Sequence, residues 1–249
     1  MGAGEALGLR GVSTTGVLVL ARFDSRRLPG KALAPLGDRP LLAHVLARVA
    51  AARSPQLLVL ATSDREVDSP ITTLGGLLGV PVFRGQADDV LRRCIECADA
   101  FGLSHVVRIS GDSPFIDPVL IDRAVAANDA GGAEMVTNVF PRSFPPGDSV
   151  EVVATETLRR VLGETTDAED REHVTRFIYA HPDRFSIVNL TAPPGLYAGI
   201  NLTVDTPADL AMARWIVARY DGPPETMAFD RIVEIARAWQ ADQEEAARA

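Results

Sequence analysis

The chain has 249 residues, of which 47% are hydrophobic, and its formal net charge is −8 with a pI near 5.1. This length suits one large α/β domain or two small ones, and the hydrophobic fraction is sufficient for a core. The acidic balance argues against a nucleic-acid-binding surface, and no apolar run approaches the roughly 20 residues of a membrane span. Residues 1–13 lack a basic segment followed by an apolar one, so we expect a cytoplasmic protein with a flexible N-terminus.

Strand-like and helix-like stretches alternate through the first half of the chain. Val17–Ala21 is a short, unbroken apolar run, typical of a strand that is covered on both faces. Further strands are predicted at 57–61, 80–83, 105–109 and 134–138, and helices at 40–52, 68–78, 88–101 and 118–130. This order predicts an α/β fold with a doubly wound, mostly parallel sheet.

The second half is less regular. Residues 140–146 contain too many prolines for an interior strand, which indicates an inserted arm. We expect strands at 150–153, 185–190 and 202–204, and helices at 171–180, 206–220 and 228–239. The sequence therefore predicts a single domain over 14–239, with an arm at about 138–153 and 185–200 and a frayed tail at 240–249.

A basic loop follows the first predicted strand. Between Ala21 and Lys31 the chain carries Arg22, Arg26 and Arg27 and ends in Pro-Gly-Lys. A strand, a basic loop and a helix together are typical of an α/β phosphate site, although a solvated surface loop has a similar composition. It is not a P-loop, because Ser25 and Ala32 stand where that motif needs glycine and a hydroxyl residue, and it lacks the glycine spacing of a dinucleotide fingerprint.

Two acidic residues follow predicted strands. Asp112 comes directly after the strand at 105–109, and Asp205 follows the strand at 202–204. Two carboxylates beside a basic loop fit Mg²⁺ bound to a nucleoside triphosphate, since this ion takes one or two carboxylates together with phosphate oxygens and water. Each also has a structural interpretation, because Gly-Asp-Ser-Pro is a common turn and Asp-Thr-Pro a common helix entry.

Cys94 and Cys97 are the only cysteines of the chain, and both fall inside a predicted helix. A second ligand pair for a zinc site is missing nearby, and a redox pair is expected at a helix start instead. We therefore expect two reduced, partly buried thiols.

Six ordered motifs resemble the cytidylyltransferases of the spore-coat polysaccharide F type, which are related to CMP-3-deoxy-manno-octulosonate and CMP-sialic acid synthetases. The resemblance extends from residue 17 to about residue 220. The motifs are Arg22–Lys31, Ala61–Asp64 with Asp68–Ile71, Phe83–Gly85 with Asp88–Leu91, Val107–Pro114, Arg171–Thr175 and Thr203–Leu210.

This resemblance implies a nucleotide-diphospho-sugar transferase-like fold and transfer of CMP from CTP to a small acidic acceptor, with Mg²⁺ and release of pyrophosphate. Arg22, Lys31 and Asp112 become the implied catalytic residues, and Asp112 and Asp205 the implied metal ligands. The implied nucleotide-binding residues are Ala21, Ser25, Arg27, Thr62, Ser63 and Ser110.

Three segments depart from the family pattern, one beside the expected phosphates and two in the region expected to contact the acceptor. Asp24 precedes Ser25 where a glycine is usual, Gly147–Glu151 differs from the usual Gly-Leu-Asp-Val-Glu, and Asn201-Leu202 replaces an Arg-Trp pair. A carboxylate at Asp24 would repel phosphate oxygens unless it faced the metal or solvent. The implied acceptor contacts are Asn138, Arg142, Glu151, Arg171, His173 and Asn201, with a structural role as the alternative for His173.

Three functions stay open at this point. The first is CTP-dependent transfer to a sugar acid or another small acidic metabolite; the second is the use of another nucleotide with a sugar 1-phosphate; the third is a catalytically idle relative. The resemblance also implies a homodimer joined through the arm. The residues Phe140, Phe144 and Pro145 would otherwise form an exposed apolar patch.

Overall fold

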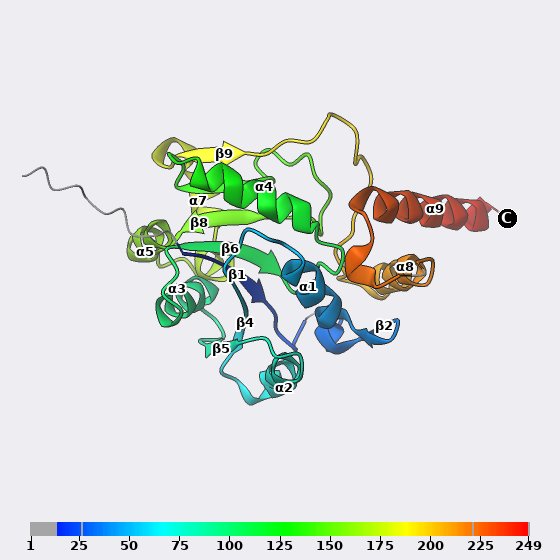
Figure 1. Cartoon of the computed structure of the whole chain (residues 1–249), viewed down its shortest axis with the longest axis horizontal. Coiled ribbons are helices and arrows are strands. Elements are labelled where there is room, and N and C mark those ends of the chain that lie inside the picture. The colour runs from blue at the N-terminus through cyan, green and yellow to red at the C-terminus, as the bar shows by residue number, and fades with distance from the viewer. Residues whose placement is uncertain (1–13, 26, 221, 249) are drawn as a thin grey trace, which may run out of the picture.

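The computed structural model describes residues 14–25, 27–220 and 222–248, so the expectation of a flexible N-terminus lies outside the described residues. Its centre is a seven-stranded sheet with helices on both faces (Figure 1). The strand order is β5 (Val82–Gly85), β4 (Leu57–Ser63), β1 (Thr15–Leu20), β6 (His105–Ser110), β8 (Glu151–Ala154), β7 (Met135–Thr137) and β9 (Ile187–Asn189).

The sheet is parallel from β5 to β6. Strand β8 runs antiparallel to both of its neighbours, and β7 pairs with β9 in parallel. The predicted mostly parallel sheet is therefore confirmed. Because β1 and β6 are adjacent and parallel, the segments that follow them leave the sheet at the same edge.

The side chains of β1 show why the apolar run forms a central strand. Val17 and Val19 pack into one hydrophobic cluster, and Leu18 packs into a second cluster on the opposite face. The first cluster includes residues of α1 (Leu41–Ala50), α4 (Pro118–Asp129), α8 (Pro207–Val217) and α9 (Phe229–Arg248). The second includes residues of α3 (Val90–Ala100), α5 (Thr155–Glu164) and α7 (Arg176–Ala180). Cys94 and Cys97 are free, buried thiols within this second cluster.

The remaining elements are short. Helix α2 (Ser69–Leu77) follows β4, and helix α6 (Ala168–Glu172) precedes α7. A small hairpin consists of β2 (Pro35–Leu36) and β3 (Arg39–Pro40). No helix of the described residues is long and apolar enough to cross a membrane.

Several predicted elements differ from the structure. Helix α5 was not predicted, and the helix predicted at 171–180 is two helices, α6 and α7, interrupted at 173–175. The segments predicted as an inserted arm contribute β8 and β9 to the central sheet. Residues 240–248 continue α9 instead of forming a frayed tail, because their alanine, glutamate, glutamine and arginine residues favour helix.

Residues 202–204 lie in an extended segment and not in a strand. The Leu202 N–H donates to the Pro146 carbonyl at 2.8 Å, and the Val204 N–H donates to the Asp112 carbonyl at 2.9 Å. Gly147, with φ of 91°, allows this approach, because a Cβ there would lie 2.4 Å from the Leu202 carbonyl carbon. The segment still brings Asp205 beside Asp112, which is what the site requires.

Candidate active site

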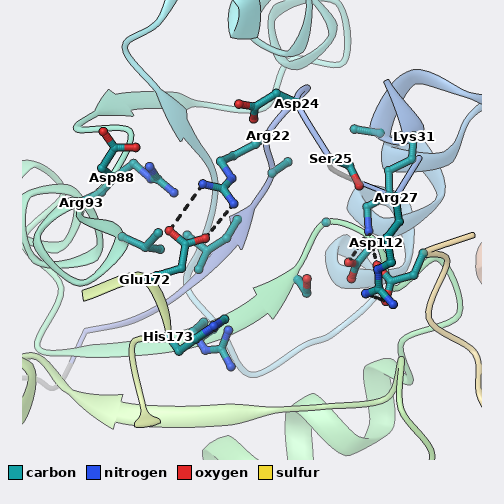
Figure 2. Close-up of a pocket in the computed structure, with 18 of the residues that line it drawn as sticks. Arg22, Asp24, Ser25, Arg27, Lys31, Asp88, Arg93, Asp112, Glu172 and His173 are labelled. Atoms are coloured by element: carbon teal, nitrogen blue, oxygen red, sulfur yellow. Dashed lines mark hydrogen bonds and ion pairs between the residues drawn. The ribbon is translucent and has the colours of Figure 1, made fainter. Parts of the chain in front are cut away.

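A cavity of about 870 Å³ opens where β1 and β6 end. The loop after β1, the turn after β6, the start of α3 and helix α6 contribute its walls. Nine residues predicted from the sequence line it, namely Ala21, Arg22, Ser25, Arg27, Lys31, Ser110, Asp112, His173 and Asp205. Figure 2 shows Lys31, Arg27 and Asp112 together on one side of this cavity, and Arg22, Glu172 and Arg93 on the other.

Lys31 connects the two predicted metal ligands. Its Nζ atom lies 2.7 Å from Asp112 Oδ2 and 2.8 Å from Asp205 Oδ1, and it donates to the Val204 carbonyl at 2.9 Å. Arg27 reaches the other oxygen of Asp205 at 2.7 Å. The side chain of Lys31 is only 12% exposed, so these attractions act in partly desolvated surroundings. Four charged groups thus meet at one end of the cavity.

The local sequence explains how these side chains are placed. Gly30, at φ 73°, closes the basic loop by donating its N–H to the Phe23 carbonyl and leads into the short helical turn at Lys31–Leu33. Asp205 immediately precedes a capping box at the start of α8, in which Thr206 and Asp209 satisfy the first backbone N–H groups. The sequence offered a helix entry as the structural alternative to a functional role for Asp205. That helix entry is present, and it also holds the Asp205 carboxylate in the cavity.

The chemistry of this end suits a divalent cation. One nitrogen within 2.8 Å of Asp112 and Asp205 shows that the two carboxylates converge on a common point. No group of three or more histidine, cysteine, aspartate or glutamate side chains among the described residues is arranged to hold a metal. A hard cation with two carboxylates, completed by phosphate oxygens and water, fits this donor set.

The opposite end of the cavity is organised by a second set of ion pairs. Arg22 contacts Glu172 on α6 at 2.7 Å. Arg65 pairs with Asp24 at 2.7 Å, so the charge expected to repel phosphate oxygens is compensated by a neighbouring cation. Neither Glu172 nor Arg65 was predicted from the sequence, because each lies far along the chain from its partner.

Comparison with known proteins agrees with this geometry. A family model described as cytidylyltransferase matches residues 16–214. The chain belongs to the cytidylyltransferase family. This cytidylyltransferase is 32% identical over 226 residues to the spore coat polysaccharide biosynthesis protein SpsF of Bacillus subtilis, covering 88% of this chain and 93% of that protein. The predicted resemblance and the predicted class of nucleotidyltransferase enzyme are therefore confirmed.

Two further relatives show the breadth of the family. The 3-deoxy-manno-octulosonate cytidylyltransferase of Geobacter sulfurreducens is 36% identical over 109 residues, which cover 44% of this chain and 43% of that protein. A solved cytidylyltransferase from Leptospira borgpetersenii has a TM-score of 0.87 at 25% identity and covers 92% of this chain and 96% of its own. This likeness confirms the predicted fold class across nearly the whole chain.

Two predicted nucleotide contacts lie behind the cavity wall of this cytidylyltransferase. Thr62 and Ser63 are fully buried in β4 and do not line the cavity. Ser63 Oγ donates to Asp68, whose other oxygen accepts the Phe23 N–H at 2.6 Å. Ser63 therefore orients the start of the basic loop, which is a structural role instead of the predicted base contact.

Glu151 does not face the cavity as predicted for an acceptor contact. It is buried and ion-paired with Arg108, and it accepts hydrogen bonds from Thr175 at 2.8 Å and Tyr179 at 2.5 Å. Burial is the main cause that raises the pKa of Tyr179, so its hydroxyl stays protonated and donates. Arg108, which does line the cavity, is thus the functional candidate, and Glu151 holds it in position.

The other predicted acceptor contacts also have different places. Arg171 pairs with Asp89 at 3.0 Å and donates to the Thr165 carbonyl, which ties α6 to α3. Asn138 is buried and bridges the backbone of 148–150. Asn201 accepts the Thr203 N–H, and Arg142 lines a separate cavity of about 370 Å³. None of these four side chains lines the main cavity. Among the six predicted acceptor contacts, His173 is the one that lines it.

Proposed function

We propose that this cytidylyltransferase transfers CMP from CTP to an oxygen of a small anionic acceptor, such as a sugar acid, and releases pyrophosphate. The observation that supports it most strongly is the bridge that Lys31 makes between Asp112 and Asp205 at the mouth of a parallel sheet. Such an arrangement combines cations for the phosphates with two carboxylates for a metal, which is what transfer at phosphorus requires.

The charged residues have distinct roles in this proposal. Arg22, Arg27 and Lys31 bind the triphosphate, and Lys31 and Arg22 stabilise the charge that develops on the departing pyrophosphate. Asp112 and Asp205 would hold Mg²⁺, and a bound magnesium ion neutralises phosphate charge and orients the leaving group. Lys31 exchanges its two carboxylate contacts for phosphate oxygens when nucleotide and cation bind. The acceptor oxygen attacks the α-phosphorus directly, without a covalent enzyme intermediate.

The anionic character of the acceptor is supported by the cavity lining. Arg108, on β6, and His173, directly after α6, both line the cavity. Figure 2 shows His173 apart from Lys31 and Asp112. Glu151 fixes the guanidinium of Arg108, so a carboxylate or a similar group of the acceptor meets a positioned donor. The Geobacter sulfurreducens relative is named for a sugar acid, 3-deoxy-manno-octulosonate, which is an acceptor of this chemical class.

Pyrophosphate release tests the proposal. The purified protein is incubated with CTP, UTP, ATP or GTP and with a panel of sugar acids, sugar 1-phosphates and small phosphonates, with and without Mg²⁺. We expect release only with CTP, an acidic acceptor and the metal ion. Release with another nucleotide and a sugar 1-phosphate would show instead that the protein is a sugar 1-phosphate nucleotidyltransferase. Absence of turnover together with absence of CTP binding by calorimetry would indicate an idle relative.

We also propose a homodimer, on the basis of the family resemblance. The supporting argument from an exposed patch is weaker than the sequence indicates, because Phe144 and Pro145 are buried within the chain. Phe140 is partly exposed and stacks on Tyr179, with ring centroids 4.9 Å apart. Light scattering of the purified protein tests the oligomeric state, and a monomeric mass would contradict the proposal.

A further inference from the structure

Asp68 is a fully buried carboxylate that lies outside the lining of the main cavity. It holds the N-cap position of α2, where an aspartate ordinarily accepts hydrogen bonds from the first backbone N–H groups of the helix. Among the described residues, no such capping bond to its side chain is present. A buried carboxylate is costly without hydrogen-bond donors, so the partners of Asp68 must come from other segments.

These partners belong to the end of β4 and to the start of the basic loop. Asp68 Oδ1 accepts the Phe23 N–H at 2.6 Å, and Oδ2 accepts the Ser63 hydroxyl. Arg65 Nη2 lies 3.7 Å from Asp68 Oδ2 and 2.7 Å from Asp24 Oδ2. The charge of Asp68 is therefore balanced by a nearby cation and by a charge-assisted bond to the backbone of the basic loop.

Phe23 connects both ends of the basic loop. Its carbonyl accepts the N–H of Ser25 at 3.0 Å and the N–H of Gly30 at 2.9 Å. Its ring packs against Gly30, where an added Cβ would lie 3.3 Å from Phe23 Cζ. Arg22 directly precedes Phe23, and Lys31 directly follows Gly30. The backbone that carries both of these cations is thus held together through Phe23, which Asp68 fixes in turn.

A loop that is fixed in advance binds a polyphosphate at a lower cost than a flexible one. A flexible loop loses conformational freedom when its side chains bind phosphates, and this loss reduces the affinity. The hydrogen bonds of Phe23 hold the basic loop in one conformation without any ligand. Figure 2 shows Arg22 and Lys31 at separate places around the cavity, so a ligand that contacts both depends on the spacing that this loop sets.

We infer that Asp68 is a positioning residue: by accepting the Phe23 N–H, it holds the basic loop so that Arg22 and Lys31 meet the triphosphate together. This inference rests on the proposed function and adds the residue that preorganises its phosphate site. Asp68 acts without touching the ligand, because it does not line the cavity. Since its role is to accept a hydrogen bond from a backbone N–H, an amide oxygen at this position replaces most of its effect, whereas a methyl group replaces none.

Calorimetry without acceptor tests the inference. Wild type, Asp68→Ala, Asp68→Asn and Asp122→Ala are each titrated with inorganic tripolyphosphate and with CTP in the presence of Mg²⁺. Asp122 is the matched control, because its Oδ1 accepts the N–H groups of Arg53 and Ser54, both at 2.8 Å, in a loop that does not line the cavity. We expect Asp68→Ala to bind both ligands about 10- to 100-fold more weakly, Asp68→Asn to stay within about 5-fold of wild type, and Asp122→Ala to keep its affinity.

Stability and kinetics separate positioning from a purely structural role. Asp68→Ala and Asp122→Ala are both expected to lower the urea midpoint, because each leaves a backbone N–H without its partner. In the pyrophosphate assay, Asp68→Ala alone is expected to raise the KM of CTP and to lower kcat, since Arg22 and Lys31 also stabilise the departing pyrophosphate. Asp68→Asn is expected to recover most of both constants.

Each contrary result has a separate meaning. Unchanged tripolyphosphate affinity in Asp68→Ala overturns the inference, as does an equal loss in Asp122→Ala. A loss in Asp68→Asn as large as that in Asp68→Ala also overturns it, because the charge and not the backbone bond then matters. Wild type that binds tripolyphosphate and not CTP overturns the proposed function alone, and wild type that binds neither overturns both.

A second variant covers the case in which Asp68→Ala does not fold. Ser63→Ala removes the hydroxyl that orients Asp68 and leaves the bond to the Phe23 N–H in place. We expect it to bind tripolyphosphate about 3- to 5-fold more weakly than wild type. Unchanged affinity in Ser63→Ala would then overturn the inference.

Discussion

The pairing of Glu151 with Arg108 makes a prediction that separates two roles for the same carboxylate. The Glu151 side chain is 2% exposed and Arg108 is 28% exposed, so removal of the Glu151 charge leaves a partly buried cation without its partner. Breaking a buried pair from one side costs about 3–5 kcal/mol. We expect Glu151→Gln to fall near the lower end, about 3 kcal/mol, because Arg108 keeps some solvent and glutamine still accepts hydrogen bonds from Thr175 and Tyr179.

Urea unfolding followed by circular dichroism measures this loss. Glu156→Gln is the matched control, because Glu156 is 85% exposed and pairs with Arg159 on the surface of α5. It is expected to change the free energy of unfolding by less than about 0.5 kcal/mol. The double variant Arg108→Met with Glu151→Gln is expected to be more stable than the sum of the single changes indicates, since no unpaired cation is left.

Kinetics of the same variants distinguish positioning from contact. If Glu151 orients Arg108, Glu151→Gln raises the KM of the acceptor. The same substitution then has little further effect on this KM in a variant that already lacks Arg108. An unfolding free energy within about 0.5 kcal/mol of wild type, with an acceptor KM that rises independently of Arg108, would refute this reasoning. Glu151 would then touch the acceptor, as the sequence alone suggests.

Further substitutions test other parts of the site and of the core. Lys31→Ala and Asp112→Asn are each expected to lower kcat/KM at least about 100-fold with native circular dichroism; near-normal activity of Asp112→Asn with Mg²⁺ would remove it from the metal site. Arg65→Met is expected to weaken CTP binding because the charge of Asp24 is left beside the phosphates, and adding Asp24→Asn should restore the affinity; no restoration would show that Arg65 itself binds nucleotide. Burial raises the pKa of Asp148 from 3.8 to about 8. Between these values the folded protein holds a proton that the unfolded chain releases, so stability falls as pH rises; Asp148→Asn should reduce that fall, measured by urea midpoints at about pH 5 and about pH 9.

Short-range patterns in the chain were enough to predict part of the fold and part of the site. The apolar run before Ala21 predicted a central strand, and Lys31, Asp112 and Asp205 were assigned to one edge of the sheet because each follows a strand or a strand-like segment. That inference needs only the parallel arrangement of neighbouring strands, which brings their carboxyl ends together. The structure confirms this convergence in the bridge from Lys31 to both carboxylates.

Which charged side chains face the cavity depends on how distant segments pack together. Arg92 and Arg93 are adjacent residues of the same type, yet the phase of α3 against β5 directs Arg92 to the surface, whereas Arg93 is buried and lines the cavity. In the same way, Glu151 and Arg171 carry suitable charges for an acceptor, but distant partners hold them inside the fold. Local periodicity specifies a strand or a helix, whereas the direction of each side chain depends on packing between segments far apart in the chain, which no local pattern contains.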